Sequence, residues 1–141
     1  MEKQHFSKAY IKRFDKSLTL DLLIDLPKKE TSSDFPFLLI IQSNIRNFTR
    51  LTIYPVKKER IVEIFLKGVN IKSEELEKFI EEIQKFEIIH TSGLILKGSE
   101  IIYECYLNLS LNDNRYKDLK TSLDKFKNIS KVIDIEEIST K

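Results

Sequence analysis

Two amphipathic helical segments, each flanked by strand-like segments, place the strongest constraint on the fold of this chain. In residues 73–86, one face at helical spacing is apolar and the other carries Glu and Lys. The apolar face consists of Leu76, Phe79, Ile80, Ile83 and Phe86. Residues 113–127 repeat the pattern with Tyr116, Leu119, Leu123 and Phe126. Both segments are therefore predicted to be helices that bury one face.

The helix starts and the exposed faces add detail to this prediction. Ser73 is expected to be the N-cap of the first helix, and Asn112 or Asp113 that of the second. Residues 74–85 carry five Glu against two Lys, whereas residues 113–127 carry five Lys or Arg against three Asp. We expect the acidic and the basic helix to attract each other weakly, because exposed ion pairs contribute little.

Strand signals surround the two helices. The segments rich in β-branched and aromatic residues are 60–67, 88–96, 100–108 and 131–138. The resulting order is β-α-β-β-α-β, which is the split arrangement of ferredoxin-like domains. The predicted fold class is therefore α+β, with a ferredoxin-like unit at residues 60–138.

The residues before this unit indicate further strands. Residues 17–27 alternate between apolar and polar side chains, as in a half-buried strand. Residues 35–42 are predicted to form a buried strand, and the alternative is a helix capped by Asp34 with Pro36 in its first turn. We expect one domain over residues 1–141, in which residues 17–56 form an N-terminal β-strand extension.

Composition and single residue types exclude several classes of function. The net charge of +2 gives no strong long-range field for nucleic acid or anionic lipid. Cys105 is the only cysteine, so neither a disulfide nor a multi-cysteine zinc site is expected. His5 and His90 are the only histidines, and three glycines supply no phosphate-binding loop, so we expect no metal and no cofactor. The apolar run at 35–41 is too short to span a bilayer, and the charged N-terminal segment does not resemble a signal peptide, so a cytoplasmic protein is expected.

A hairpin with a turn at Gly98 brings the polar candidates for a site together. His90, Ser92, Glu104 and Tyr106 are expected on one face of the sheet, and Cys105 on the other. A Cys–His nucleophilic pair is therefore excluded by geometry, and no G-x-S-x-G elbow surrounds Ser92. No catalytic residue is assigned, although a small hydrolase that uses His90 and Glu104 remains an alternative.

The same face of the sheet is expected to be half apolar. Its expected apolar residues are Ile61, Phe65, Ile88, Leu94, Ile102 and Tyr106. This is more apolar surface than a monomer usually exposes, so either the N-terminal strands or a second chain should cover it. A nucleic-acid partner is not expected, because Glu63 and Glu104 on this face repel phosphate, although Lys57, Lys58 and Arg60 cluster nearby.

The segment KGVN, which joins the first strand of the unit to its first helix, carries a resemblance to a known family. With this element order, residues 60–138 resemble ACT-type and related amino-acid-sensing regulatory domains. The resemblance implies dimerisation and small effectors bound at the bend, which nominates Gly68, Val69 and Asn70. The chain departs from the family pattern at Phe65, where an aspartate is usual.

These observations predict a non-catalytic regulatory module that binds a small effector or a protein partner and self-associates as a homodimer. The expected ligand-binding residues are Gly68, Val69, Asn70, His90, Ser92, Glu104 and Tyr106. The alternative is a protein–protein adaptor without a ligand, which would use exposed strand edges or the acidic helix. Neither nucleic acid nor a membrane is an expected partner.

Overall fold

The computed structural model describes residues 7–13, 35–126 and 132–140. The described residues form two compact units, one within residues 61–137 and the other within residues 7–60 and 138–140. The protein is α+β, as predicted. The strand predicted at 17–27 lies outside the described residues.

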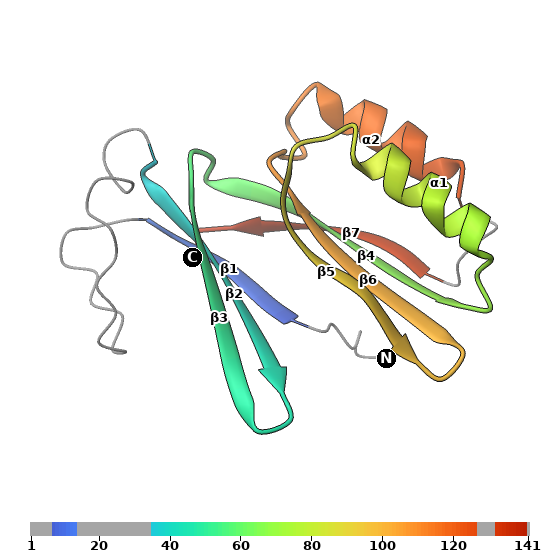
Figure 1. Cartoon of the computed structure of the whole chain (residues 1–141). Helices are drawn as coiled ribbons and strands as arrows, with labels where there is room; N and C mark the ends of the chain where they lie inside the picture. Colours follow the sequence, from blue (N-terminus) through green and yellow to red (C-terminus); the bar gives the residue numbers. More distant parts are fainter. Residues whose placement is uncertain (1–6, 14–34, 127–131, 141) are drawn as a thin grey trace. The chain divides into compact units, whose positions relative to one another are not determined.

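The first unit contains a four-stranded sheet in the order β5-β6-β4-β7 and both helices (Figure 1). Its strands are β4 (Arg60–Val69), β5 (Ile88–Lys97), β6 (Glu100–Leu107) and β7 (Val132–Ser139). Its helices are α1 (Ser73–Ile83) and α2 (Arg115–Asp124), so the elements follow each other as β4-α1-β5-β6-α2-β7. β5 and β7 are the edge strands.

Both helices lie on one face of this sheet, as the apolar spacing of their sequences requires (Figure 1). The buried core between them includes Val62, Ile64 and Leu66 from β4, Tyr103, Cys105 and Leu107 from β6, and Leu76, Phe79, Leu119 and Leu123 from the helices. Phe79 lies at its centre, because its ring meets those of Tyr103 and Phe126 edge-on at centroid distances of 6.0 and 5.4 Å. Such edge-to-face pairs add to the stabilisation from burial alone.

Helix α1 begins at the expected place with a different cap. Lys72 occupies the N-cap position with extended backbone angles, and no side chain caps the helix. The prediction that Ser73 is the N-cap is therefore wrong by one residue. Glu74 and Glu75 lie in the first turn, where negative charge offsets the partial positive charge of the exposed amides.

Helix α2 begins later than its sequence suggested. Asn114 occupies the N-cap position, and its side chain makes no capping hydrogen bond. The Asp113 carboxylate instead accepts a hydrogen bond from the backbone N–H of Arg115 at 3.1 Å. Neither predicted residue is therefore the N-cap, although Asp113 satisfies an amide at the helix start.

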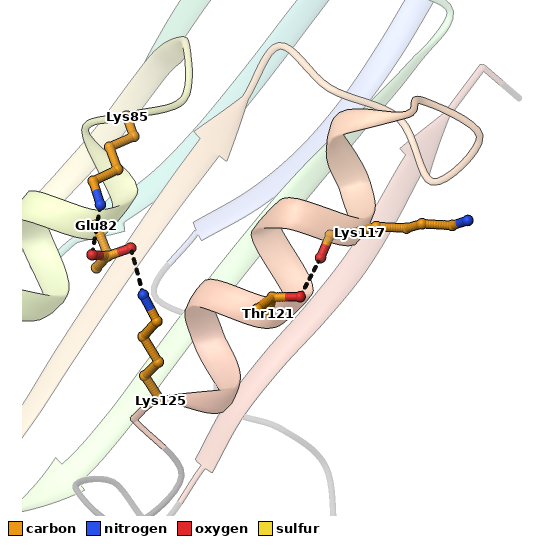
Figure 2. A network of polar contacts seen from close by, with 5 residues as sticks. All are labelled: Glu82, Lys85, Lys117, Thr121 and Lys125. Carbon is orange, nitrogen blue, oxygen red and sulfur yellow. Dashed lines mark hydrogen bonds and ion pairs between the residues drawn. The ribbon is translucent and has the colours of Figure 1, made fainter.

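The exposed sides of the acidic and basic helices are linked through the Glu82 carboxylate (Figure 2). Lys125 of α2 lies 3.8 Å from Glu82, and Lys85 donates a 2.7 Å hydrogen bond to the same carboxylate. These partners, Lys85 first, hold the pKa of Glu82 below its ordinary value. The ion pair is exposed, so it sets the alignment of the helices more than their stability.

The second unit contains a three-stranded antiparallel sheet in the order β1-β2-β3 (Figure 1). Its strands are β1 (Ser7–Arg13), β2 (Phe37–Ile45) and β3 (Phe48–Val56). The prediction of a buried strand at 35–42 is confirmed, and the alternative helix is wrong. Neighbouring residues of β2 point to opposite faces, yet Leu38, Leu39, Ile40 and Ile41 are all buried, which explains the uninterrupted apolar run.

No helix within the described ranges is long and apolar enough to cross a membrane.

Candidate functional site

The β5–β6 hairpin carries the polar residues singled out in the sequence. Lys97 pairs with Glu100, which leaves Gly98 and Ser99 as a two-residue turn. Gly98 has a φ of +62°, which matches a type II′ turn with glycine in its first position. A turn centred on Gly98 would leave Lys97, Gly98 and Ser99 unpaired, so the observed turn is one residue shorter than expected.

Two irregularities in β5 change the expected register. Ile88 pairs with Leu107 and Leu94 pairs with Tyr103, whereas the pairs between them follow the expected register. Directly opposed residues share a face, so Ile88 and Leu94 lie on the helix side of the sheet. Their predicted position on the opposite face is wrong, because each bulge reverses the side-chain direction beyond it.

The central pairs of the hairpin agree with the prediction. His90 pairs with Tyr106 and Thr91 pairs with Cys105, so His90 and Cys105 lie on opposite faces of the sheet. Cys105 belongs to the helix-side core. Burial raises the pKa of its thiol to about 12, so the thiol stays protonated and is a poor nucleophile.

Ser92 is engaged in local hydrogen bonds within one bulge. Its hydroxyl accepts a hydrogen bond from the backbone N–H of Glu104 at 2.9 Å and donates one to the carbonyl of Gly93 at 2.8 Å. The Thr91 hydroxyl accepts a further bond from the N–H of Gly93 at 3.1 Å. The Ser92 hydroxyl therefore supports the backbone where the ladder is interrupted.

Four of the polar side chains gather on the face opposite the helices, and we call them the carboxylate patch: Glu63, His90, Glu104 and Tyr106. Glu63 of β4 pairs with Tyr106 of β6, whose hydroxyl donates to the Glu63 carboxylate at 3.5 Å. The rings of His90 and Tyr106 lie 6.0 Å apart at a tilt of 48°. The structure thus joins three predicted site residues to Glu63, which was predicted only as a charge that repels phosphate.

The Glu63 carboxyl has a strongly perturbed acidity. Burial raises its pKa to about 8, with further contributions from the negative charges of Glu104 and Glu136 and against the hydrogen bond from Tyr106. Most Glu63 side chains therefore carry a proton at neutral pH and can donate a hydrogen bond. Glu63 pairs with Tyr106 on the neighbouring strand β6, which also carries Glu104. The register between β4 and β6 would have identified Glu63 as a site residue, but the sequence alone does not give this register.

Substrate access to the carboxylate patch is poor. Glu104 and Tyr106 are 0% exposed and Glu63 is 6% exposed. Ile61 and Phe65, which were expected on an open apolar face, are buried as well. A proton donor of raised pKa is one requirement of acid–base catalysis, but a substrate must also reach it.

The other predicted site residues lie elsewhere on the sheet. Gly68 and Val69 belong to β4 and pair with Ile101 and Glu100, so they do not form the predicted bend. The chain turns at Asn70, which is exposed and has a left-handed φ of 56°. Gly68 lies five residues beyond Glu63, about 17 Å along the strand, so the nominated residues form two separate groups.

Among the described residues, no group of three or more His, Cys, Asp or Glu side chains is arranged to hold a metal ion. No family model matches the chain, and no curated protein matches its sequence.

The accessible apolar side chains lie outside the carboxylate patch. The exposed large ones among the described residues are Phe48 (56%), Leu94 (46%), Leu96 (71%) and Leu111 (40%). Leu94 and Leu96 both belong to β5, an edge strand of the four-stranded sheet. These surfaces are better placed than the carboxylate patch to meet another molecule.

Proposed function

We propose that the chain is a non-catalytic regulatory module that self-associates through β5, an edge strand of the sheet that the described residues form. In this proposal residues 60–138 act as a ferredoxin-like unit of the ACT type. The chain order of strands and helices and the helices on one face support this classification. The buried carboxylate patch then has a structural role, and recognition takes place at the sheet edge and at the Asn70 bend.

The observation that carries the proposal is the exposed pair Leu94 and Leu96 on an edge strand. An edge strand leaves backbone N–H and C=O groups free to pair with another strand, and exposed apolar side chains on it favour that pairing. Leu94 and Leu96 pair with Tyr103 and Ile101 across the ladder, so both lie on the helix side. Together they form a short apolar strip on a strand that ends the sheet of the described residues.

A second copy of β5 fits this edge in one antiparallel register. If the two-fold axis passes through Ile95, Leu94 of one copy lies opposite Leu96 of the other, and the pair occurs twice. Lys97 then lies opposite Gly93, so no like charges oppose each other. Residues 94–97 also pair regularly with β6, which leaves a straight segment for the new ladder.

The proposed effector site is the bend after β4. Asn70 is exposed, and its backbone N–H donates to the carbonyl of Ser99 at 3.2 Å. The bend therefore adjoins the turn that ends β5, so a small effector held by Gly68, Val69 and Asn70 would act beside the associating edge. The single buried thiol, Cys105, suits a reducing cytoplasm.

Cysteine cross-linking tests the proposed edge directly. Opposed residues in an antiparallel pair have Cα atoms about 4.5–5.5 Å apart, which a disulfide can bridge. We expect Ile95→Cys to form a covalent dimer under mild oxidation, while the more exposed control Leu111→Cys does not. Native Cys105 is 0% exposed, so it does not interfere.

Sedimentation equilibrium provides the second measurement. We expect a dimer for the native chain and a monomer for Leu96→Lys, because two lysines would oppose the Leu94 pair. A native chain that stays monomeric at millimolar concentration contradicts self-association. A shift of the dimerisation constant by a panel of amino acids would support the effector role, and its absence would contradict that part alone.

The adaptor function is the second candidate, and the exposed acidic face of α1 favours it. Glu77 and Glu81 are both exposed and leave α1 with a net negative face. A stoichiometric partner retained from native lysate, and lost on charge reversal at Glu77 and Glu81, would support the adaptor. A hydrolase using His90 and Glu104 is the least supported function, because Glu104 is fully buried.

A further inference from the structure

Charge is divided unequally along the chain. Residues 61–137 contain 15 acidic and 11 basic side chains, a net charge of −4. Residues 35–58, which include β2 and β3, contain four basic side chains and no acidic one, and β1 contains three basic and no acidic. Glu63 and Glu104, whose charges argued against a phosphate-bearing partner, belong to the four-stranded sheet and not to the sheet of β2 and β3.

The tip of the β2–β3 hairpin presents an aromatic ring between two arginines. Ile45 pairs with Phe48, so Arg46 and Asn47 form a two-residue turn. Phe48 is 56% exposed, and Arg46 and Arg50 are also exposed. Phe48 and Arg50 project from the same side of β3 about 7 Å apart, because side chains two residues apart share a face.

Local contacts hold the hairpin tip in place. The Thr49 hydroxyl donates to the Asn44 side-chain carbonyl at 3.0 Å, and the Gln42 amide donates to the same oxygen at 3.5 Å. Arg46 has a φ of +33°, in the left-handed region that a long side chain rarely adopts. Strained residues of this kind persist where the surroundings fix them, and they cluster at binding sites.

We propose that the tip of the β2–β3 hairpin binds single-stranded nucleic acid, with a base stacked on Phe48 and phosphates at Arg46 and Arg50. Proteins that bind single strands combine basic side chains with exposed aromatic rings in this way. In a duplex the bases are stacked on each other, so the exposed ring favours a single strand. An acidic protein segment would satisfy the arginines but leave the ring without a planar partner.

A tryptophan reporter tests the stacking. The chain contains no tryptophan, so Phe48→Trp creates a single emitter at the proposed contact. We expect a labelled 12-nucleotide poly-dT or poly-U strand to quench this emission, and polyglutamate and the matching duplex to leave it unchanged. A stronger response to polyglutamate or to the duplex would overturn the proposal in favour of that partner.

Affinity variants test the two contributions by fluorescence anisotropy of the same labelled strands. Phe48→Ala should weaken binding about 10- to 100-fold. The double variant Arg46→Glu, Arg50→Glu should lower the slope of log K against log salt by about 1.4, which corresponds to two lost phosphate contacts. The matched control carries two charge reversals on α2, Lys117→Glu and Lys120→Glu, and should bind as the native chain does.

The outcomes separate the proposal from non-specific attraction. Quenching together with the losses in both hairpin variants supports it, provided that circular dichroism shows each variant folded. Salt-sensitive binding that neither quenches Phe48→Trp nor depends on Phe48 overturns it, as does the absence of binding at 50 mM salt. The dimer measurements above do not enter this test, so either proposal can fail alone.

Discussion

Strands β4 and β2 occupy inner positions in their sheets, and each is buried on both faces, but the two strands use different residues. Both are buried on the two faces that they present, from Ile61 to Leu66 in β4 and from Phe37 to Ile41 in β2. The β2 run is wholly apolar, whereas β4 contains Glu63, whose carboxyl shares its surroundings with Glu104. A buried strand therefore need not be apolar throughout if a proton can neutralise its carboxylate.

The first unit, which includes β4, contains both helices, whereas the described residues of the second unit, which includes β2, contain no helix. Helix packing gives the first unit an apolar core on one face of its sheet, and the buried carboxyl of Glu63 lies on the opposite face. The second unit keeps basic and aromatic side chains at its hairpin tip. The two units therefore differ in where they place charge of functional interest: the first buries the carboxyl of Glu63, and the second exposes the arginines Arg46 and Arg50 at its hairpin tip.

The largest expected effect contrasts one buried and one exposed phenylalanine. Phe79→Ala should lower the free energy of unfolding by about 3–5 kcal/mol, because it removes a ring at the centre of the helix-side core. Phe48→Ala makes the same change on a side chain that is 56% exposed and should stay within about 0.5 kcal/mol. Urea denaturation followed by circular dichroism measures both free energies of unfolding. Similar decreases in the two variants would contradict the contrast between the buried core and the exposed hairpin tip.

The next effect is a dependence of stability on pH that originates in β4. The pKa of Glu63 is about 8 in the folded chain against an ordinary value of 4.5, so the folded chain holds a proton that the unfolded chain releases. The stabilisation that this proton contributes is fully present below pH 4.5 and is lost as the pH rises through 8. Between about pH 6 and pH 9, the free energy of unfolding should fall by roughly 2–3 kcal/mol.

A neutral replacement isolates this contribution. Glu63→Gln imitates the protonated carboxyl and cannot ionise, so most of the fall between pH 6 and pH 9 should disappear. Glu77→Gln, on the exposed face of α1, removes a solvent-exposed carboxylate and serves as the control, which should keep the native slope. An unchanged slope in the Glu63 variant would mean that the buried carboxyl is not the titrating group.

The helices were predictable because their signal is local. Apolar residues at spacings of three and four define the buried face without knowledge of any partner, and the buried Phe79 and Leu123 confirm it. The N-cap of α1 was missed because Ser73 has a capping side chain, while the backbone that decides the cap belongs to Lys72. The sequence thus predicts that these segments are helices, but it does not predict at which residue each helix begins.

The candidate site was predictable only in part, for a physical reason. His90 opposite Tyr106 follows from the hairpin, but the bulges that shift Ile88 and Leu94 depend on the Ser92 and Thr91 hydroxyls, which replace ladder bonds. Glu63 and Tyr106, which pair with each other, are 43 residues apart in the sequence, so no local sequence pattern predicts this pairing. Long-range register, which sets the patch, is what one sequence lacks.

A smaller effect concerns the contact that joins the helices at their ends. Arg115, at the start of α2, donates to the Lys85 carbonyl at 2.9 Å and lies 5.1 Å from the centre of the Phe86 ring. Arg115→Ala should lower the unfolding free energy by about 1–2 kcal/mol. Arg115→Lys keeps the charge but not the planar fork, so thermal melting should place it between Ala and the native chain. A lysine variant as stable as the native chain would show that charge alone suffices.

The smallest expected effect is the ion pair between the acidic and the basic helix. Lys125→Gln removes the cation that lies 3.8 Å from Glu82, and it leaves the shorter bond from Lys85 in place. The thermal midpoint should fall slightly at low salt and match the native value in 1 M NaCl, where the Debye length is about 3 Å. Lys117→Gln, which removes an α2 cation whose side chain points away from Glu82 in Figure 2, is the control for overall charge. A loss that persists in high salt would show that Lys125 stabilises the helices by packing of its aliphatic stem, and the charge division between α1 and α2 would then have no part in holding them together.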